Sequence, residues 1–225
     1  MTISETVILN LKNLGLSNEQ FYQLCQINEN WRLEQTAQGE LLIMPPVGAI
    51  SGNREAEFNA DLVIWNRQTQ LGKVFSSSTI FILSNGGKRS PDVAWIANER
   101  WETLTSEEQE KFAPICPDFV IELRSRHSRG AARSRSDSLT QLQKKMTSDP
   151  ALCGAVSFRA AEDARERARM QEYIDSGLRL GWLIDPQNQQ VAIYRQNQPM
   201  ELVSLPTTLS GENVLPGFTL ELPVF

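Results

Sequence analysis

Histidine and cysteine are scarce in this chain of 225 residues. The single histidine is His127, which argues against a serine-type catalytic triad and against a histidine-rich metal site. The three cysteines, Cys25, Cys116 and Cys153, are odd in number and far apart. They therefore fit neither a disulfide framework nor a zinc-binding pattern. We expect a cytoplasmic protein with reduced thiols.

Long apolar runs and a basic leader are also lacking. No apolar stretch approaches the roughly 20 residues that a membrane-spanning helix needs, so we expect no membrane association. The first residues, Met1–Glu5, show neither the basic nor the apolar part of a secretory signal. The net charge of −5 argues against a protein that binds nucleic acid by bulk electrostatics. This net charge is still compatible with an enzyme that contacts nucleic acid through a local metal site and a few basic residues.

Two acidic residues lie in stretches that otherwise have the composition of buried strands. Asp92 lies in the stretch 89–95, and Glu122 lies in the stretch 118–124. Burying an ionised carboxylate without a partner costs several kcal/mol, roughly, so each acid must be paired, protonated or bound to metal. Side chains alternate between the faces of a strand, so Glu122 and Arg124 share a face. The pattern is Pro-Asp92…Glu122-x-Arg124.

This pattern has two interpretations, and the spacing alone leaves both open. In the first, Asp92 and Glu122 are hard oxygen ligands for Mg²⁺, and a neighbouring cation holds the attacking water or an anionic substrate. In the second, Asp92 is an ordinary acid of an edge strand, and Glu122 forms an ion pair with a basic residue of a helix. Short motifs of this length occur often by chance.

Strand and helix signals alternate along the chain and predict an α/β or α+β fold with a mixed sheet. A capping box at Ser17 opens one helix, and a second helix from about Asn53 to Gln70 is expected to end at Gly72. A turn is expected at Asn85–Gly87, and another capped helix begins at Thr105. Strands are expected at 31–34, 40–44, 74–75, 79–83, near Asp92, near Glu122, and at 182–185, 190–195 and 218–222.

Two stretches, 126–135 and 147–170, differ from the rest in composition. Together they hold 8 of the arginines and none of the lysines, and without them the chain has a net charge of −9. We interpret both as insertions into a single domain of residues 1–225. The first, rich in arginine, is either a nucleic-acid contact or a solvated loop. The second is expected to be irregular over Asp149–Gly154 and then helical to about Ser176, with Gly177 as the stop.

With these two stretches set aside, the chain resembles the Uma-two family of restriction-endonuclease-like proteins. This family belongs to the PD-(D/E)XK nuclease superfamily. The resemblance implies a restriction-endonuclease-like mixed sheet flanked by helices, preceded here by an N-terminal helix and hairpin. The segments that carry it are 53–57, 72–79, 89–95, 111–125, 144–146, 171–177, 181–186 and 215–218.

The resemblance also implies roles for three acidic residues. Asp92 and Glu122 would be the metal-binding catalytic acids, with Mg²⁺ as cofactor and Mn²⁺ as a substitute. Glu57, on the first long helix, corresponds to an additional acidic residue of the catalytic site.

Three basic residues receive roles by the same resemblance. The motif lysine has moved in this family from the strand to the following helix, where Lys145 is the best match and Lys144 the second. Lys145 would orient or deprotonate the attacking water, and Lys144 would contact the substrate. Arg124 occupies the original lysine position, but its high pKa makes it a poor general base. We therefore expect Arg124 to contact a substrate phosphate or a carboxylate, Glu122 included.

The expected function is that of a Mg²⁺-dependent endonuclease that hydrolyses phosphodiester bonds in DNA. A homodimer is left open. The alternative is a non-catalytic binding module on a nuclease fold, because a fold does not determine a function. The sequence departs from the family near the motif lysine, where Arg126 replaces a proline and both insertions flank Lys145. If the helix that carries Lys145 no longer packs beside Asp92 and Glu122, we expect activity to be lost.

Overall fold

A computed structural model describes residues 6–124 and 150–225, and the side chains of 6–124 and 163–225. Lys144 and Lys145, the first insertion and residues 147–149 lie outside the described residues. The chain divides into two compact units: Met1–His127 with Tyr173–Phe225, and Ser128–Glu172. The first unit contains both acidic residues of the predicted motif.

The first unit is built on a six-stranded mixed sheet in the order β11-β10-β9-β8-β7-β4. Strands β8 and β9 run parallel, and all other neighbours pair antiparallel, as the expected mixed sheet requires. The bounds of its strands are β4 Gly72–Ser76, β7 Val93–Ala97, β8 Phe119–Leu123, β9 Leu180–Asp185, β10 Gln190–Arg195 and β11 Glu201–Ser204. The predicted strands around Glu122, at 182–185 and at 190–195 are confirmed.

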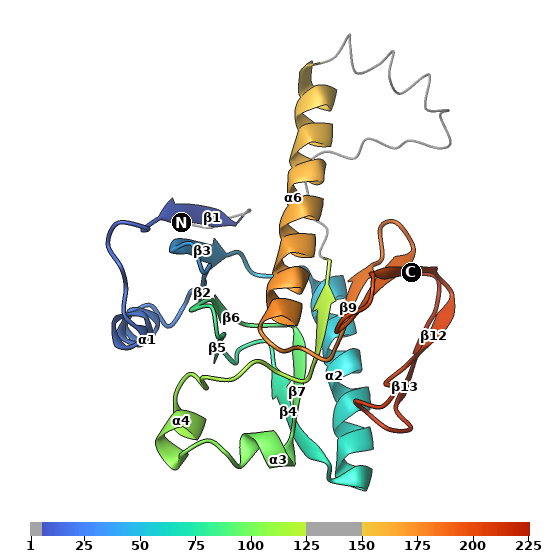
Figure 1. The fold of residues 1–225 in the computed structure, drawn as a ribbon. Coiled ribbons are helices and arrows are strands. Elements are labelled where there is room, and N and C mark those ends of the chain that lie inside the picture. The colour runs from blue at the N-terminus through green and yellow to red at the C-terminus, as the bar shows by residue number, and fades with distance from the viewer. Residues whose placement is uncertain (1–5, 125–149) are drawn as a thin grey trace. The chain divides into compact units, whose positions relative to one another are not determined.

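One face of this sheet packs against helix α2 (Ala49–Thr69) and the hairpin of β12 (Thr207–Ser210) and β13 (Thr219–Leu222) (Figure 1). The helix contributes Phe58, Leu62 and Trp65, which are the apolar stripe that its sequence predicts. The sheet contributes alternate residues of β7 and β8, among them Trp95 and Ile121. Because side chains alternate along a strand, Asp92 and Glu122 must lie on the opposite face.

The end of α2 differs from the prediction. The left-handed residue that closes the helix is Gln70, with φ of 56°, whereas Gly72 is the first residue of β4. A Cβ atom at Gly72 would lie 2.2 Å from the carbonyl oxygen of Ile96 and 2.5 Å from the ring of Trp95. Gly72 is therefore required by the close approach of β4 and β7, and its assignment as the helix stop was wrong.

A second, five-stranded sheet precedes the motif, in the order β1-β3-β2-β6-β5. Helix α1 (Asn18–Ile27) carries the predicted capping box at Ser17 and buries Phe21 against this sheet. The predicted hairpin and the turn at Asn85–Gly87 are confirmed. Strand β6 runs through Ser90 and Pro91 directly into Asp92 and β7, so the second sheet ends beside the first acid. The strands are β1 Val7–Asn10, β2 Arg32–Gln35, β3 Glu40–Met44, β5 Phe81–Ile82 and β6 Lys88–Arg89.

Three helices complete the described residues. The short helices α3 (Asn98–Trp101) and α4 (Ser106–Glu110) link β7 to β8. Helix α6 (Pro150–Asp175) begins at its proline, so the expected irregular start over 150–154 was wrong. Proline is well tolerated at the first position of a helix, because a backbone N–H at that position would have no hydrogen-bond partner within the helix. Gly177, with φ of 107°, follows the helix as predicted. No helix among the described residues is long and apolar enough to cross a membrane.

Candidate active site

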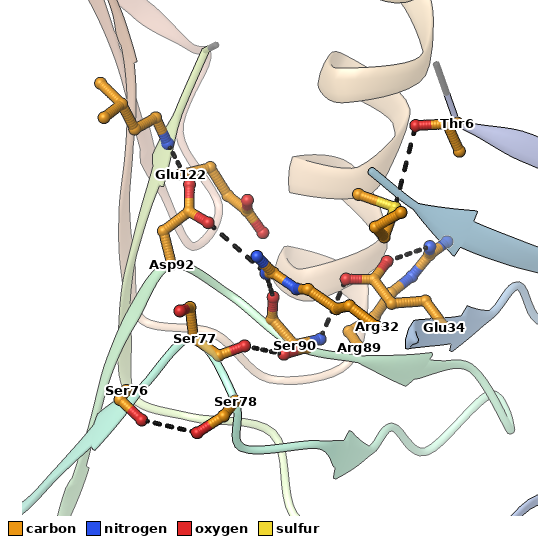
Figure 2. A network of polar contacts seen from close by, with 12 residues as sticks. Thr6, Arg32, Glu34, Ser76, Ser77, Ser78, Arg89, Ser90, Asp92 and Glu122 are labelled. Atoms are coloured by element: carbon orange, nitrogen blue, oxygen red, sulfur yellow. Dashed lines mark hydrogen bonds and ion pairs between the residues drawn. The ribbon is translucent and has the colours of Figure 1, made fainter. Parts of the chain in front are cut away.

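Asp92 and Glu122 lie side by side on the face of the six-stranded sheet opposite α2. Strands β7 and β8 pair antiparallel with Val93 across from Ile121. Continued by one residue, this register puts Asp92 across from Glu122. Side chains directly opposite in such a pair share a face, with Cβ atoms about 4.5–5.5 Å apart. Figure 2 shows both carboxylates directed into the same space. The structure thus brings together the two acids that the motif predicts.

Both oxygens of Asp92 have a hydrogen-bond donor. The backbone N–H of Leu123 on the neighbouring strand donates to Oδ2 over 2.8 Å. The guanidinium of Arg32 approaches Oδ1 to 3.4 Å, from strand β2 of the second sheet. The Asp92 side chain is 13% exposed, so it keeps a limited opening to solvent. Its carboxylate is therefore held in place by one backbone group and one cation.

Glu122 is more deeply buried, at 6% exposed. The hydroxyl of Tyr173, on the last turn of α6, donates to its Oε1 over 3.0 Å. Tyr173 itself is fully buried. Its carbonyl oxygen accepts from the backbone N–H of Leu178 over 2.9 Å and from the thiol of Cys116 over 3.5 Å. A tyrosine fixed at both ends orients the Glu122 carboxylate.

A buried ion pair anchors the segment that leads into Asp92. Glu34, fully buried on β2, accepts from Arg89 over 3.2 Å and from the backbone N–H of Ser90 over 3.2 Å. The carbonyl oxygen of Ser90 in turn accepts from Arg32 (Figure 2). The second sheet thus fixes both the backbone before Asp92 and the cation beside it.

Arg32 and Glu34 were not singled out in the sequence. Both residues occupy the same face of a strand, two positions apart, next to the buried Leu33. A charged residue on the inner face of an apolar strand is the feature that singled out Asp92 and Glu122. Strand β2 has one apolar residue among four, so this feature does not single out Arg32 and Glu34.

The third acid near the pair is Glu55 of α2. Burial raises the pKa of the Glu55 carboxyl, and the negative charge of Asp92 raises it further. A hydrogen bond with Ser77 and the charge of Arg32 act in the opposite direction. Glu55 is therefore within electrostatic reach of both Asp92 and Arg32.

Glu57, the acid chosen from the sequence, lies elsewhere on the helix. It is exposed, and its charge adds to burial in raising the pKa of Asp61. Two residues along an α-helix correspond to a rotation of about 200°, so Glu55 and Glu57 project from opposite sides. The structure places Glu55, rather than Glu57, toward Asp92.

Arg124, at the original lysine position of the motif, pairs with Asp185 at the end of β9. Asp185 also accepts from the backbone N–H groups of Gln187 and Asn188, each over 3.0 Å. The backbone N–H of Arg124 donates to Ile184 over 2.9 Å. Arg124 therefore helps to fasten β8 to β9.

The donor set at Asp92 and Glu122 fits a magnesium ion better than a softer metal. Within residues 6–124 and 163–225, no three His, Cys, Asp or Glu side chains form a group that could hold a metal. Mg²⁺ keeps several waters and is often bound through one or two carboxylates. Two adjacent carboxylates, one of them partly open to solvent, satisfy this requirement.

Comparisons with known proteins identify the fold and the family of this chain. No curated protein matches the chain. Among solved structures, the crystal structure of a "putative nuclease belonging to DUF820" from Anabaena variabilis ATCC 29413 is similar. It is 18% identical in sequence, with a TM-score of 0.55, over 85% of this chain and 87% of that one. This likeness shows the fold. Residues 18–224 match Uma2, a family described as "Putative restriction endonuclease", and the chain belongs to this family.

Proposed function

We propose that this protein is a Mg²⁺-dependent nuclease that hydrolyses phosphodiester bonds in DNA. The observation that carries the proposal is the register of β7 and β8, which sets Asp92 opposite Glu122 on one face of the sheet. Asp92, directly before β7, and Glu122, on β8, lie together, and the surrounding residues fix the position of each. The family supports a nuclease, and the preference for DNA and for Mg²⁺ is our inference.

Asp92 and Glu122 would hold the metal, and other residues of the chain would prepare them for it. Leu123 and Tyr173 orient the two carboxylates through the hydrogen bonds at 2.8 Å and 3.0 Å. When bound, the ion would supply Lewis-acid stabilisation of the phosphate and activation of a water. Arg32, beside Asp92, can attract the phosphate that lies next to the bond to be broken.

The roles of the remaining predicted residues are assigned by the same proposal. We place Glu55, in preference to Glu57, as the helix acid that assists the metal through water. Lys145 remains our choice for orienting or deprotonating the attacking water, with Lys144 as a substrate contact. We assign Arg124 mainly to its pair with Asp185, since that pair already occupies its guanidinium group.

A non-catalytic binding module is the second candidate, and one observation favours it. The cation at the original lysine position is held by Asp185, at the end of the neighbouring strand. In such a protein Arg124 would not be available to the attacking water or to the substrate. The protein would then keep the fold and bind nucleic acid without cleaving it. The two candidates differ in whether metal-dependent cleavage exists.

The experiment is a cleavage assay on plasmid and single-stranded DNA with Mg²⁺, together with a Mn²⁺ titration by calorimetry. The wild-type protein should bind Mn²⁺ and cleave. Asp92→Asn and Glu122→Gln should each abolish cleavage and weaken Mn²⁺ binding, because an amide keeps the shape of a carboxyl group and loses its charge.

Glu221→Gln, which changes an exposed strand acid outside the site, is the matched control and should behave as wild type. Glu55→Gln and Glu57→Gln, compared with each other, show which helix acid assists. Cleavage that survives in both Asp92→Asn and Glu122→Gln would exclude this site. Mn²⁺ binding without any cleavage would favour the binding module.

A further inference from the structure

A cavity of about 1080 Å³ opens beside the acid pair, between the β2–β3 hairpin, helix α2 and the end of β4. Its wall is shared with the site: Arg32, which contacts Asp92, and Glu55 both line it. Ser77 also lines it, and the Ser77 carbonyl oxygen accepts from the Ser90 hydroxyl (Figure 2). A group in this cavity would therefore lie next to a phosphate held at Asp92.

The rest of the lining is mainly apolar and includes one aromatic side chain. Trp31 is 36% exposed and lies on this surface, together with the partly or largely exposed Pro45 and Val47. The amide-bearing Asn30 and Asn59 add hydrogen-bonding groups. Each such amide carries both donors and an acceptor, which is what the edge of a nucleobase requires.

The size and chemistry of the cavity suit a base better than a sugar-phosphate backbone. Pockets for small molecules usually measure about 300–1000 Å³, so this one has room for a nucleotide and its neighbouring groups. Phosphates would need several cations, and the chain as a whole carries a net charge of −5. A planar base, in contrast, can stack on Trp31 and fill an apolar wall.

A base that stacks on a protein side chain cannot at the same time be stacked and paired within a duplex. We propose that this cavity binds an unpaired nucleobase of the substrate, next to the phosphate at Asp92. The substrate class is thus single-stranded DNA, or a duplex with an unpaired nucleotide. This inference rests on the proposed function, because the base is taken to belong to the strand that is cleaved.

The test is equilibrium binding of a short fluorescein-labelled thymidine strand, alone or paired with adenosines, measured by fluorescence anisotropy. EDTA is present, so that binding is measured without turnover. The single strand should bind at least about tenfold more tightly than the duplex. Trp31→Ala should weaken single-strand binding about 5- to 150-fold, the usual range for losing one base–aromatic stack. Trp31→Phe should retain most of the affinity.

Leu202→Ala is the matched control, because Leu202 is an exposed apolar residue on β11 that does not line the cavity. It should bind as wild type does. A strand with one abasic position in register with the cavity should bind the wild-type protein as weakly as the intact strand binds Trp31→Ala. Combining the two changes should cause little further loss.

Two outcomes separate this inference from the proposed function. If the strand binds in a Trp31-dependent way and the wild type never cleaves, the cavity is a site for an unpaired base and the nuclease proposal fails. If the wild type cleaves, and Trp31→Ala leaves both single-strand affinity and KM unchanged, the nuclease proposal holds and the inference is overturned. Equal affinity for duplex and single strand, or no binding of either, would also overturn it.

Discussion

The hydroxyl of Tyr173 donates a hydrogen bond to Oε1 of Glu122 over 3.0 Å, with both side chains buried. The tyrosine comes from the end of α6, and the glutamate comes from β8. A carboxylate at 6% exposure needs a donor, because water reaches it poorly. The contact therefore both stabilises the buried charge and sets the direction in which the second Glu122 oxygen points.

Tyr173→Phe removes this donor and keeps the ring. Residues that orient a metal ligand usually cost about 10- to 100-fold in metal affinity or activity when changed, and we expect a loss of that size in kcat/KM and in Mn²⁺ affinity. Both are measured on the purified protein, with Tyr22→Phe as the control. Full activity of Tyr173→Phe would show that Glu122 is held by other groups.

The site could be predicted from sequence where it depends on regular strand geometry. The alternation of apolar residues around Asp92 and Glu122 determines the face of the sheet on which each acid lies. The register that aligns Val93 with Ile121 then places the two acids next to each other. Arg32 and Tyr173 were not predicted. Arg32 reaches Asp92 across 60 positions, and Tyr173 reaches Glu122 across 51. Such contacts depend on how separate elements pack, which no local pattern encodes.

The sequence could not separate Glu55 from Glu57 for a different reason. Glu55 and Glu57 lie two positions apart in a helix that the sequence predicts well, and the motif alone does not tell them apart. Only the rotation of α2 about its own axis decides which one approaches Asp92. That rotation is set by the packing of Phe58, Leu62 and Trp65 on the sheet.

Glu55 should make stability depend on pH. Its pKa is raised above the ordinary 4.5, first by burial and then by Asp92. In the window above 4.5 the folded protein therefore keeps a proton that the unfolded chain releases, so stability falls as the pH rises through the folded pKa. Glu55→Gln should remove this fall and raise the melting temperature at neutral pH.

Asp92→Asn provides the second arm of that experiment. Without the negative charge of Asp92, the pKa of Glu55 should move back toward its ordinary value, which a ¹³C titration of the Glu55 carboxyl would show. Both measurements are made in EDTA. A melting temperature with the same pH dependence in wild type and Glu55→Gln would contradict the raised pKa of Glu55. An unchanged titration of Glu55 in Asp92→Asn would contradict its electrostatic contact with Asp92.

Changing Arg124, which pairs with Asp185, tests whether this arginine has a structural role or contacts the substrate. Arg124→Ala should lower the free energy of unfolding by about 1–3 kcal/mol, because Asp185 is buried and loses a charged partner. If the role is structural, the dependence of DNA binding on salt should stay unchanged. A phosphate contact would instead reduce the slope of log K against log salt by about 1.

Gly72→Ala should be among the most damaging single changes in the sheet. Its Cβ would lie 2.2 Å from a backbone oxygen, which cannot move without separating β4 from β7. We expect a loss of about 1–3 kcal/mol or more in urea unfolding, typical of overpacking. Gly52→Ala is the matched comparison. It lies within α2 with only Val47 at 3.7 Å, so it should stabilise the helix by about 1 kcal/mol.

Deleting Thr147–Met170 tests whether this stretch is an insertion. Among the deleted residues whose side chains the structure describes, 163–170, none belongs to the main hydrophobic core that includes Phe58, Trp95 and Trp182, and Met170 is the one that is fully buried. The deletion joins Met146 to Gln171 and so restores a methionine three positions before Tyr173. We expect a melting temperature that is unchanged or higher. We also expect a cleavage rate that is retained or raised, because Lys145 would then lie four positions before Tyr173, whose hydroxyl contacts Glu122. A large fall in melting temperature would show that the segment is part of the folded core.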